Sequence, residues 1–238
     1  MVKHTPGKIF LAEQRGLLEN PRFQRYSTFR FGEYAAEHKE PFGDLHGLNE
    51  ETLAGGECVV VAAPQASQLL VLPVTGEVKA QAGAGAPALV DVGEMYLTTV
   101  AADDTVRFTN PYESHLISFL HVWLKAAPEE ATKTSQVFAF DSWAMVNQLA
   151  EARAVAPAPD GAGRAFVLSL GQFAGRAETS YQLRSEANRF FAFVLAGAFE
   201  VEGRLLHEKD GLALWGTPAV ELEALSNHAV VLVLEMAG

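Results

Sequence analysis

Short apolar runs recur along the whole chain, and turn-forming residues separate them. The runs are about as long as β-strands and are rich in Val, Leu and Phe, which favour strands over helices. They cover residues 58–63, 68–74, 88–92, 95–100, 116–124, 165–170, 190–195, 213–215 and 229–234. Many short strands at regular spacing, with Gly, Pro, Asn and Asp between them, predict an all-β sandwich or barrel.

Two stretches depart from this strand pattern. Within residues 140–153, the apolar residues Trp143, Val146, Leu149 and Ala150 fall at i, i+3, i+6 and i+7, which is the spacing of one helix face, so a helix is expected there. A further helical turn is expected near residues 49–53.

The two halves of the chain repeat one order of elements. Residues 70–78 and 193–201 each read as a strand, a glycine turn and a return strand, and an acidic residue beside glycine follows each. We therefore predict two copies of one β module. The first domain is predicted at residues 1–126 and the second at 127–238, with its barrel starting near residue 164; strand exchange at the chain termini would blur this boundary.

The charge balance excludes one class of partner. The formal net charge is −11, the pI is about 5.1, and the basic residues are scattered rather than grouped in a stripe. Such a surface repels nucleic acid phosphates, so no nucleic acid partner is expected. We expect a cytoplasmic protein, because the chain has a single cysteine, Cys58, and no signal-peptide pattern. We expect no membrane partner, because no apolar run reaches 18 residues.

Three segments resemble motifs of the pirin-like family. These segments are YSTFRFGEY at residues 26–34, PFGDLHGLNEE at 41–51 and HVWL at 121–124. They fall in the family's order and at similar separations. They are similar to its aromatic-(H/S)-T-F-S-F-x-x-Y opening, its F-G-x-L-R-V-L-N-E-D segment and its Q-I-W-I strand. Pirin-like proteins are bicupins. The resemblance therefore implies an all-β fold of two tandem cupin (jelly-roll-like) β-barrels, with one or two short helices.

The resemblance also implies where a metal would bind. The first cupin of the family holds iron or another divalent metal through three His and one Glu, and members resemble quercetin 2,3-dioxygenases or act as regulators of other proteins. Aligned without gaps, the four ligand positions fall on Ala62, Pro64, Phe108 and Asn110. A transition metal needs imidazole, carboxylate or thiolate donors, and one Asn does not replace them. We therefore expect a metal-free protein without a cofactor.

Other residues offer weaker candidates. His38, Asp44 and His46, with Glu37 and Glu40, form the densest group of possible metal ligands. His115 and His121 lie in one predicted strand, about 20 Å apart, which is too far to share an ion. The first barrel is predicted to enclose either a pocket for a small organic ligand or its own side chains. The lining residues would be Val60, Ala62, Gln68, Leu70, Thr98, Phe108, Asn110 and Phe119.

Three functions fit these observations. The favoured one is a non-catalytic bicupin that has lost the family's metal site and either binds a small organic ligand or regulates a protein partner. The alternative is a metal-dependent dioxygenase, similar to quercetin 2,3-dioxygenase, whose ligands have moved to the region of His38, Asp44 and His46. The third is a metal-free enzyme that uses carboxylates such as Asp44 and Glu50 as acid or base.

Overall fold

The computed structural model describes residues 5–34, 36, 38–126, 135–140, 146–155 and 165–238. These residues form two compact units. The N-terminal unit comprises the described residues of 15–140, and the C-terminal unit comprises residues 5–14 together with the described residues of 146–238. The strand that follows residue 134 therefore lies with the strands before residue 126, and the first described residues lie with the strands of the second half.

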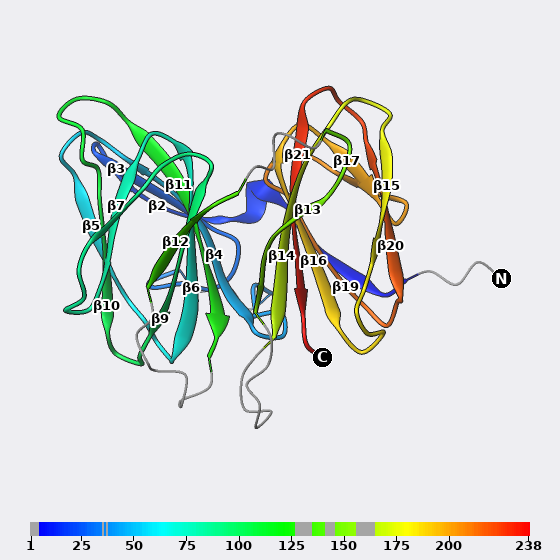
Figure 1. The fold of residues 1–238 in the computed structure, drawn as a ribbon, viewed down its shortest axis with the longest axis horizontal. Coiled ribbons are helices and arrows are strands. Elements are labelled where there is room, and N and C mark those ends of the chain that lie inside the picture. Colours follow the sequence, from blue (N-terminus) through cyan, green and yellow to red (C-terminus); the bar gives the residue numbers. More distant parts are fainter. Residues whose placement is uncertain (1–4, 35, 37, 127–134, 141–145, 156–164) are drawn as a thin grey trace. The chain divides into compact units, whose positions relative to one another are not determined.

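Two antiparallel sheets build the N-terminal unit (Figure 1). Their strands are β2 (Gly16–Asn20), β3 (Phe23–Ser27), β4 (Leu45–Leu53), β5 (Cys58–Ala62), β6 (Ser67–Thr75), β7 (Val78–Ala82), β8 (Ala88–Val90), β9 (Glu94–Val100), β10 (Thr105–Thr109), β11 (Ile117–Lys125) and β12 (Gln136–Ala139). One sheet has the order β12-β9-β6-β11-β4-β3-β2, and the other has the order β5-β10-β7-β8. Strand β11 is central to the larger sheet, because it pairs with both β4 and β6.

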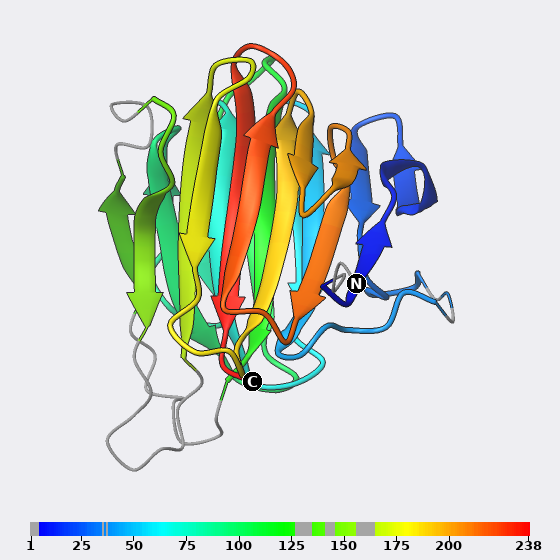
Figure 2. The ribbon, with the colours of Figure 1, turned by 90° about the vertical axis from the view of Figure 1, so that its right-hand side faces the viewer.

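The C-terminal unit repeats this plan with a six-stranded and a four-stranded sheet. Its strands are β1 (Gly7–Phe10), β13 (Ala150–Val155), β14 (Phe166–Phe173), β15 (Glu178–Gln182), β16 (Arg189–Ala196), β17 (Phe199–Val201), β18 (Arg204–Leu206), β19 (Gly211–Trp215), β20 (Ala219–Ala224) and β21 (Ala229–Met236). The sheet orders are β1-β19-β16-β21-β14-β13 and β15-β20-β17-β18. Strand β1, blue in Figure 2, forms one edge of the larger sheet by pairing with β19.

Each unit has its own apolar core. In the N-terminal unit, residues from both sheets are completely buried, among them Val71, Tyr96, Val106, Phe108 and Trp123. In the C-terminal unit the same holds for residues such as Phe190, Phe199, Leu214, Val220 and Val231. Successive side chains of a strand point to opposite faces, so every second residue of a strand joins its core. The expected all-β fold of two similar modules is therefore confirmed.

Both helix predictions are wrong over the described residues. Ala150–Val155 forms the edge strand β13, which pairs with β14, and residues 141–145 of the predicted helix lie outside the described part. Residues 49–53 lie in β4, between β11 and β3. In both places pairing with a neighbouring strand overrides a weak local preference for helix.

Helical structure within the described residues is confined to one 3-10 turn, Ala12–Gln14. No helix among these residues has the length and apolar character needed to cross a membrane.

Candidate functional site

Two of the four positions aligned with metal ligands have structural roles. Phe108 is completely buried on β10, and its ring centroid lies 5.1 Å from that of Phe119 and 5.1 Å from that of His121. Asn110 closes the loop after this strand. Its Nδ2 donates to the carbonyl oxygens of Leu53, at 3.0 Å, and of His115, at 2.7 Å, and its Oδ1 accepts the N–H of Tyr112 at 3.0 Å.

The other two positions face outward. Ala62 and Pro64 are exposed, whereas Val61 and Ala63 are buried in the core of the N-terminal unit. Val60, two residues before Ala62 and therefore on the same face of β5, is 48% exposed. The sequence analysis expected Val60 and Ala62 to line the interior of the barrel. In the structure both residues lie on its outer face. The inward face of β5 is one residue out of step with that alignment, and such a shift exchanges the two faces of a strand.

The remaining residues of the expected pocket do not form one surface. Phe119 and Thr98 are buried and face the interior, and the Thr98 hydroxyl lies 2.9 Å from Ser135 Oγ. Gln68 and Leu70 are also buried, but they alternate along β6 with Leu69, which belongs to the core. Their side chains therefore lie on the opposite face of the larger sheet.

The alternative ligand group is also divided. His38 is exposed, whereas Asp44 and His46 are each only 5% exposed. Nε2 of His46 lies 3.0 Å from the hydroxyl of Ser67, which itself donates to the carbonyl of Gln65. The hydroxyl oxygen therefore accepts a hydrogen bond from the Nε2–H of a neutral His46 imidazole. Burial, and then the charge of Lys125, lower the pKa of His46 to about 4.

A polar cluster lies inside the N-terminal unit. It comprises Arg25, Ser27, Asn49, Glu51 and His121, from the adjacent strands β3, β4 and β11, and all five are buried. The register of β3 and β4 pairs Ser27 with Asn49 and Arg25 with Glu51. On the other side of β4, His121 of β11 pairs with Asn49. Five polar side chains thus share the inward face of a sheet whose interior is otherwise largely apolar.

Hydrogen bonds fix the protonation of the cluster. The Trp123 indole N–H donates to His121 Nδ1 at 2.6 Å, so the ring proton sits on Nε2, which donates to Glu51 Oε1 at 2.8 Å. Burial lowers the pKa of His121 and outweighs the opposite effect of Glu51. The imidazole is therefore neutral, and the Glu51 carboxylate is balanced by the Arg25 guanidinium, whose Nε donates to the same oxygen.

Several buried atoms of this cluster lack hydrogen bonds. Among the described residues, none bonds to Arg25 Nη2, to Glu51 Oε2 or to either amide atom of Asn49. An unsatisfied buried polar atom costs about 1–3 kcal/mol of stability. Such atoms in a folded protein call for a partner, such as water or a ligand.

A cavity of about 340 Å³ lies against this cluster. It is lined by Gly16, Leu17, Leu18, Arg25, Ser27, Phe31, Glu33 and Tyr34, all in the N-terminal unit. The Tyr34 ring lies over Gly16 so closely that a Cβ there would sit 2.2 Å from the ring. Burial raises the pKa of Tyr34, so its phenol stays protonated at neutral pH. The lining combines apolar walls with two members of the polar cluster, which is typical of small-molecule sites.

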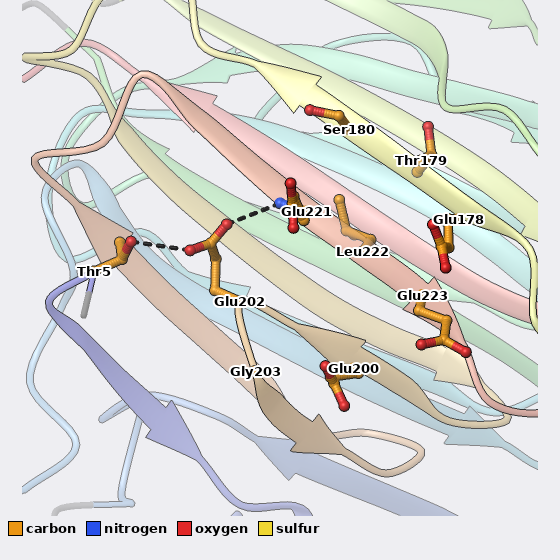
Figure 3. Close-up of a pocket in the computed structure, with 10 residues that line it drawn as sticks. All are labelled: Thr5, Glu178, Thr179, Ser180, Glu200, Glu202, Gly203, Glu221, Leu222 and Glu223. Carbon is orange, nitrogen blue, oxygen red and sulfur yellow. Dashed lines mark hydrogen bonds between the residues drawn. The ribbon is translucent and has the colours of Figure 1, made fainter. Parts of the chain in front are cut away.

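A second hollow, of about 610 Å³, lies on the outer face of the four-stranded sheet of the C-terminal unit. Figure 3 shows the five glutamates that line it: Glu178, Glu200, Glu202, Glu221 and Glu223. Glu202 accepts bonds from the Thr5 hydroxyl, at 3.0 Å, and from the Glu221 N–H, at 2.9 Å. Glu223 pairs with Arg176 at 2.9 Å. These carboxylates are largely solvated or paired, and none of the described residues that line this hollow has a buried side-chain atom without a hydrogen bond.

The interior of the C-terminal unit holds a buried carboxylate of a different kind. Glu235 is 1% exposed and accepts bonds from the Tyr181 hydroxyl, the Arg184 N–H and the Asn188 side chain, at 2.7, 2.7 and 2.6 Å. Both of its oxygens are satisfied, so it joins the loop after β15 to the sheet. The unsatisfied cluster of the N-terminal unit is therefore the stronger candidate for a binding site.

No metal site is apparent in the part of the chain that the structure describes. No group of three or more His, Cys, Asp or Glu there is arranged to hold an ion. The donors at the aligned positions do not fit a metal either. The side chains of Ala62, Pro64 and Phe108 have no lone pair, and the side chain of Asn110 is engaged with three backbone groups.

The sequence analysis missed the polar cluster. It considered His121 only as a metal ligand shared with His115, and it gave Glu51 to a predicted helical turn. The available signal was His121 itself, a polar residue within the otherwise apolar run of residues 119–124. A buried polar residue is more informative than an exposed apolar one.

Comparison with known proteins identifies the C-terminal cupin and the fold of the whole chain. Residues 164–236 match the family model described as the quercetinase C-terminal cupin domain. No curated protein matches the chain. YhhW from Escherichia coli is similar in structure, with a TM-score of 0.81, 19% identity and 97% of both chains covered.

Two further solved structures extend this likeness. The nickel(II) complex of the bacterial pirin YhhW, from the same organism, has a TM-score of 0.81 and 20% identity, and the match covers 98% of this chain and 99% of that one. Quercetin 2,3-dioxygenase from Acinetobacter baumannii has a TM-score of 0.67 and 12% identity, with 97% and 85% covered. At these identities the likeness shows the fold.

Proposed function

We propose that this chain is a non-catalytic pirin-like bicupin that has lost the family's metal site and binds a small organic molecule. The observation that carries this proposal is the packing of Phe108. Its ring fills the barrel interior against Phe119 and His121, at a position where the family resemblance expects a metal ligand. A completely buried phenyl ring leaves no room there for an ion with bound substrate.

The polar cluster supports binding rather than catalysis at this place. Its histidine is neutral and is hydrogen-bonded through both ring nitrogens, to Trp123 and Glu51. Such an imidazole has no free nitrogen for a metal or for a substrate proton. The cavity beside the cluster is lined by Arg25 and Ser27 together with apolar and aromatic side chains. We also place the protein in the cytoplasm, since its one cysteine, Cys58, is free.

The alternative is a metal-dependent dioxygenase with relocated ligands. A structure similar to this one carries the name quercetin 2,3-dioxygenase, and another is of a bacterial pirin with nickel(II). The residues proposed for relocation are less favourable. His38 is exposed, and the Nε2–H of His46 donates a hydrogen bond to the Ser67 hydroxyl.

Turnover of quercetin separates the two functions. The protein is purified without chelator, divided, and incubated with Fe(II), Mn(II), Ni(II) or buffer before quercetin and air are added. We expect the quercetin absorbance to decay at the rate of a heat-denatured control in all four samples. Metal-stimulated decay that His38→Gln or His46→Gln abolishes would overturn the proposal in favour of the relocated site.

A further inference from the structure

We infer that the cavity of the N-terminal unit binds a small organic amine, with its protonated nitrogen at Glu33 and its apolar body against the cavity walls. The inference rests on the proposed function and adds the chemical class of the ligand. It concerns a place different from the aligned metal positions, since neither Phe108 nor Asn110 lines this cavity.

The lining of the cavity carries an uncompensated negative charge. Among the described residues that line it, Arg25 and Glu33 are charged. The Arg25 guanidinium donates to the Glu51 carboxylate, so these two charges balance each other. Glu33 is exposed, and its side chain forms no hydrogen bond or ion pair within the described part of the chain. The cavity therefore presents a carboxylate that has no cationic partner.

The other ionisable groups near the cavity do not offset this charge. Burial raises the pKa of Tyr34, so its phenol is uncharged at neutral pH. His121 is neutral, and Arg15 pairs with Glu50 at 3.0 Å. The whole chain adds a formal net charge of −11. An anionic ligand would thus be repelled, whereas a cationic ligand would gain an ion pair with Glu33.

Ser27 supplies a second acceptor inside the cavity. It is 2% exposed and lines the cavity, yet its hydroxyl forms no hydrogen bond within the described residues. Its Oγ is not one of the completely buried atoms that lack a partner, so it keeps accessible surface, whereas Arg25 Nη2 is one of them. A buried polar group of this kind calls for a partner. An ammonium group carries three N–H donors, which suit a hydroxyl oxygen as well as a carboxylate.

The walls of the cavity favour an apolar body on the ligand. Phe31 and Tyr34 supply aromatic surface, and Leu17 and Leu18 supply aliphatic surface from the edge strand β2. The volume of about 340 Å³ lies at the small end of the range for ligand pockets, roughly 300–1,000 Å³. An amine with a single ring or a short aliphatic chain meets both the volume and the charge.

Three probes of similar shape test the charge requirement. Benzylamine, benzyl alcohol and benzoate differ mainly in charge, and each is titrated into the full-length protein at pH 7 by calorimetry and by NMR. We expect benzylamine to bind roughly fivefold tighter than benzyl alcohol, which is the strength of an ion pair at an exposed carboxylate, and benzoate to bind most weakly. The difference should narrow in about 1 M NaCl, because salt screens an exposed charge.

Matched variants locate the binding. Glu33→Gln removes the charge and keeps the size of the side chain, whereas Glu19→Gln removes the charge of another exposed residue, on β2, that does not line the cavity. We expect the first variant to lose the preference for benzylamine over benzyl alcohol and the second to retain it. Leu18→Trp fills the cavity from a residue that is 43% exposed, so it should weaken the binding of both probes.

The outcomes separate this inference from the proposed function. Equal affinity of the wild-type protein for benzylamine and benzyl alcohol, or a preference for benzylamine that persists in Glu33→Gln, would overturn the assignment of the ligand. No saturable binding of benzylamine would overturn it as well. None of these results would produce metal-stimulated quercetin turnover, which is the outcome that contradicts the proposed function.

Discussion

At the scale of single residues, two of the aligned metal positions support the fold instead: Phe108 packs in the core, and Asn110 closes the loop after β10. Ala62, Pro64, Phe108 and Asn110 could be assigned from the sequence as poor ligands, because that depends only on their chemistry. That Asn110 binds three backbone groups depends on a loop conformation that no local pattern encodes.

Phe108 should contribute strongly to stability. Phe108→Ala is expected to lower the free energy of unfolding by about 3–5 kcal/mol, because it removes a ring packed on Phe119 and His121. Urea denaturation followed by Trp fluorescence measures this, with Leu89→Ala, at a residue 53% exposed, as the control. A loss below about 1 kcal/mol would mean that Phe108 borders open space instead of filling the core.

His46 should make the fold sensitive to acid. Its pKa is about 4 in the folded protein against an ordinary value of 6.5, so the unfolded chain binds the additional proton between these values. Stability should therefore fall as the pH drops from about 6.5 to 4, by about 3 kcal/mol at most. We expect His46→Gln to reduce this dependence in denaturation curves, and His207→Gln, at an exposed residue, to leave it unchanged. Identical pH profiles for both variants would contradict the assignment.

At the scale of elements, the strands were predictable and their faces were harder to assign. Apolar runs located most strands, because strand-length runs bounded by turn residues carry a strong signal. The run at residues 58–63 is apolar on both sides, so its pattern does not say whether Val60 or Val61 faces the core. The pairing of β5 with β10 settles this, and that partner lies far away in the sequence.

Thiol labelling tests the register of β5. In a Cys58→Ser background, Val60→Cys should react with a maleimide in the native protein, because residue 60 is exposed. Val61→Cys should react only after unfolding, because residue 61 is 5% exposed. The opposite pattern would restore the register inferred from the sequence, with residues 60 and 62 inside the barrel.

At the scale of the whole molecule, the repeat of turns and strands was enough to predict two β modules, and the resemblance to pirin-like proteins supplied their topology. His121 was a signal for a buried polar residue, but the membership of the polar cluster could not be predicted because its members are distant along the chain. Arg25 and Glu51 are separated by 26 positions, and Glu51 and His121 by 70. Only the order β11-β4-β3 within one sheet brings them together.

The central claim is that this bicupin has exchanged its metal site for packed side chains. Elemental analysis of the protein, purified without added metal or chelator and measured again after incubation with iron, tests it most directly. We predict a substoichiometric trace of transition metal that iron does not raise. One iron, manganese or nickel per chain would contradict the account and make His38 and His46 the first residues to substitute.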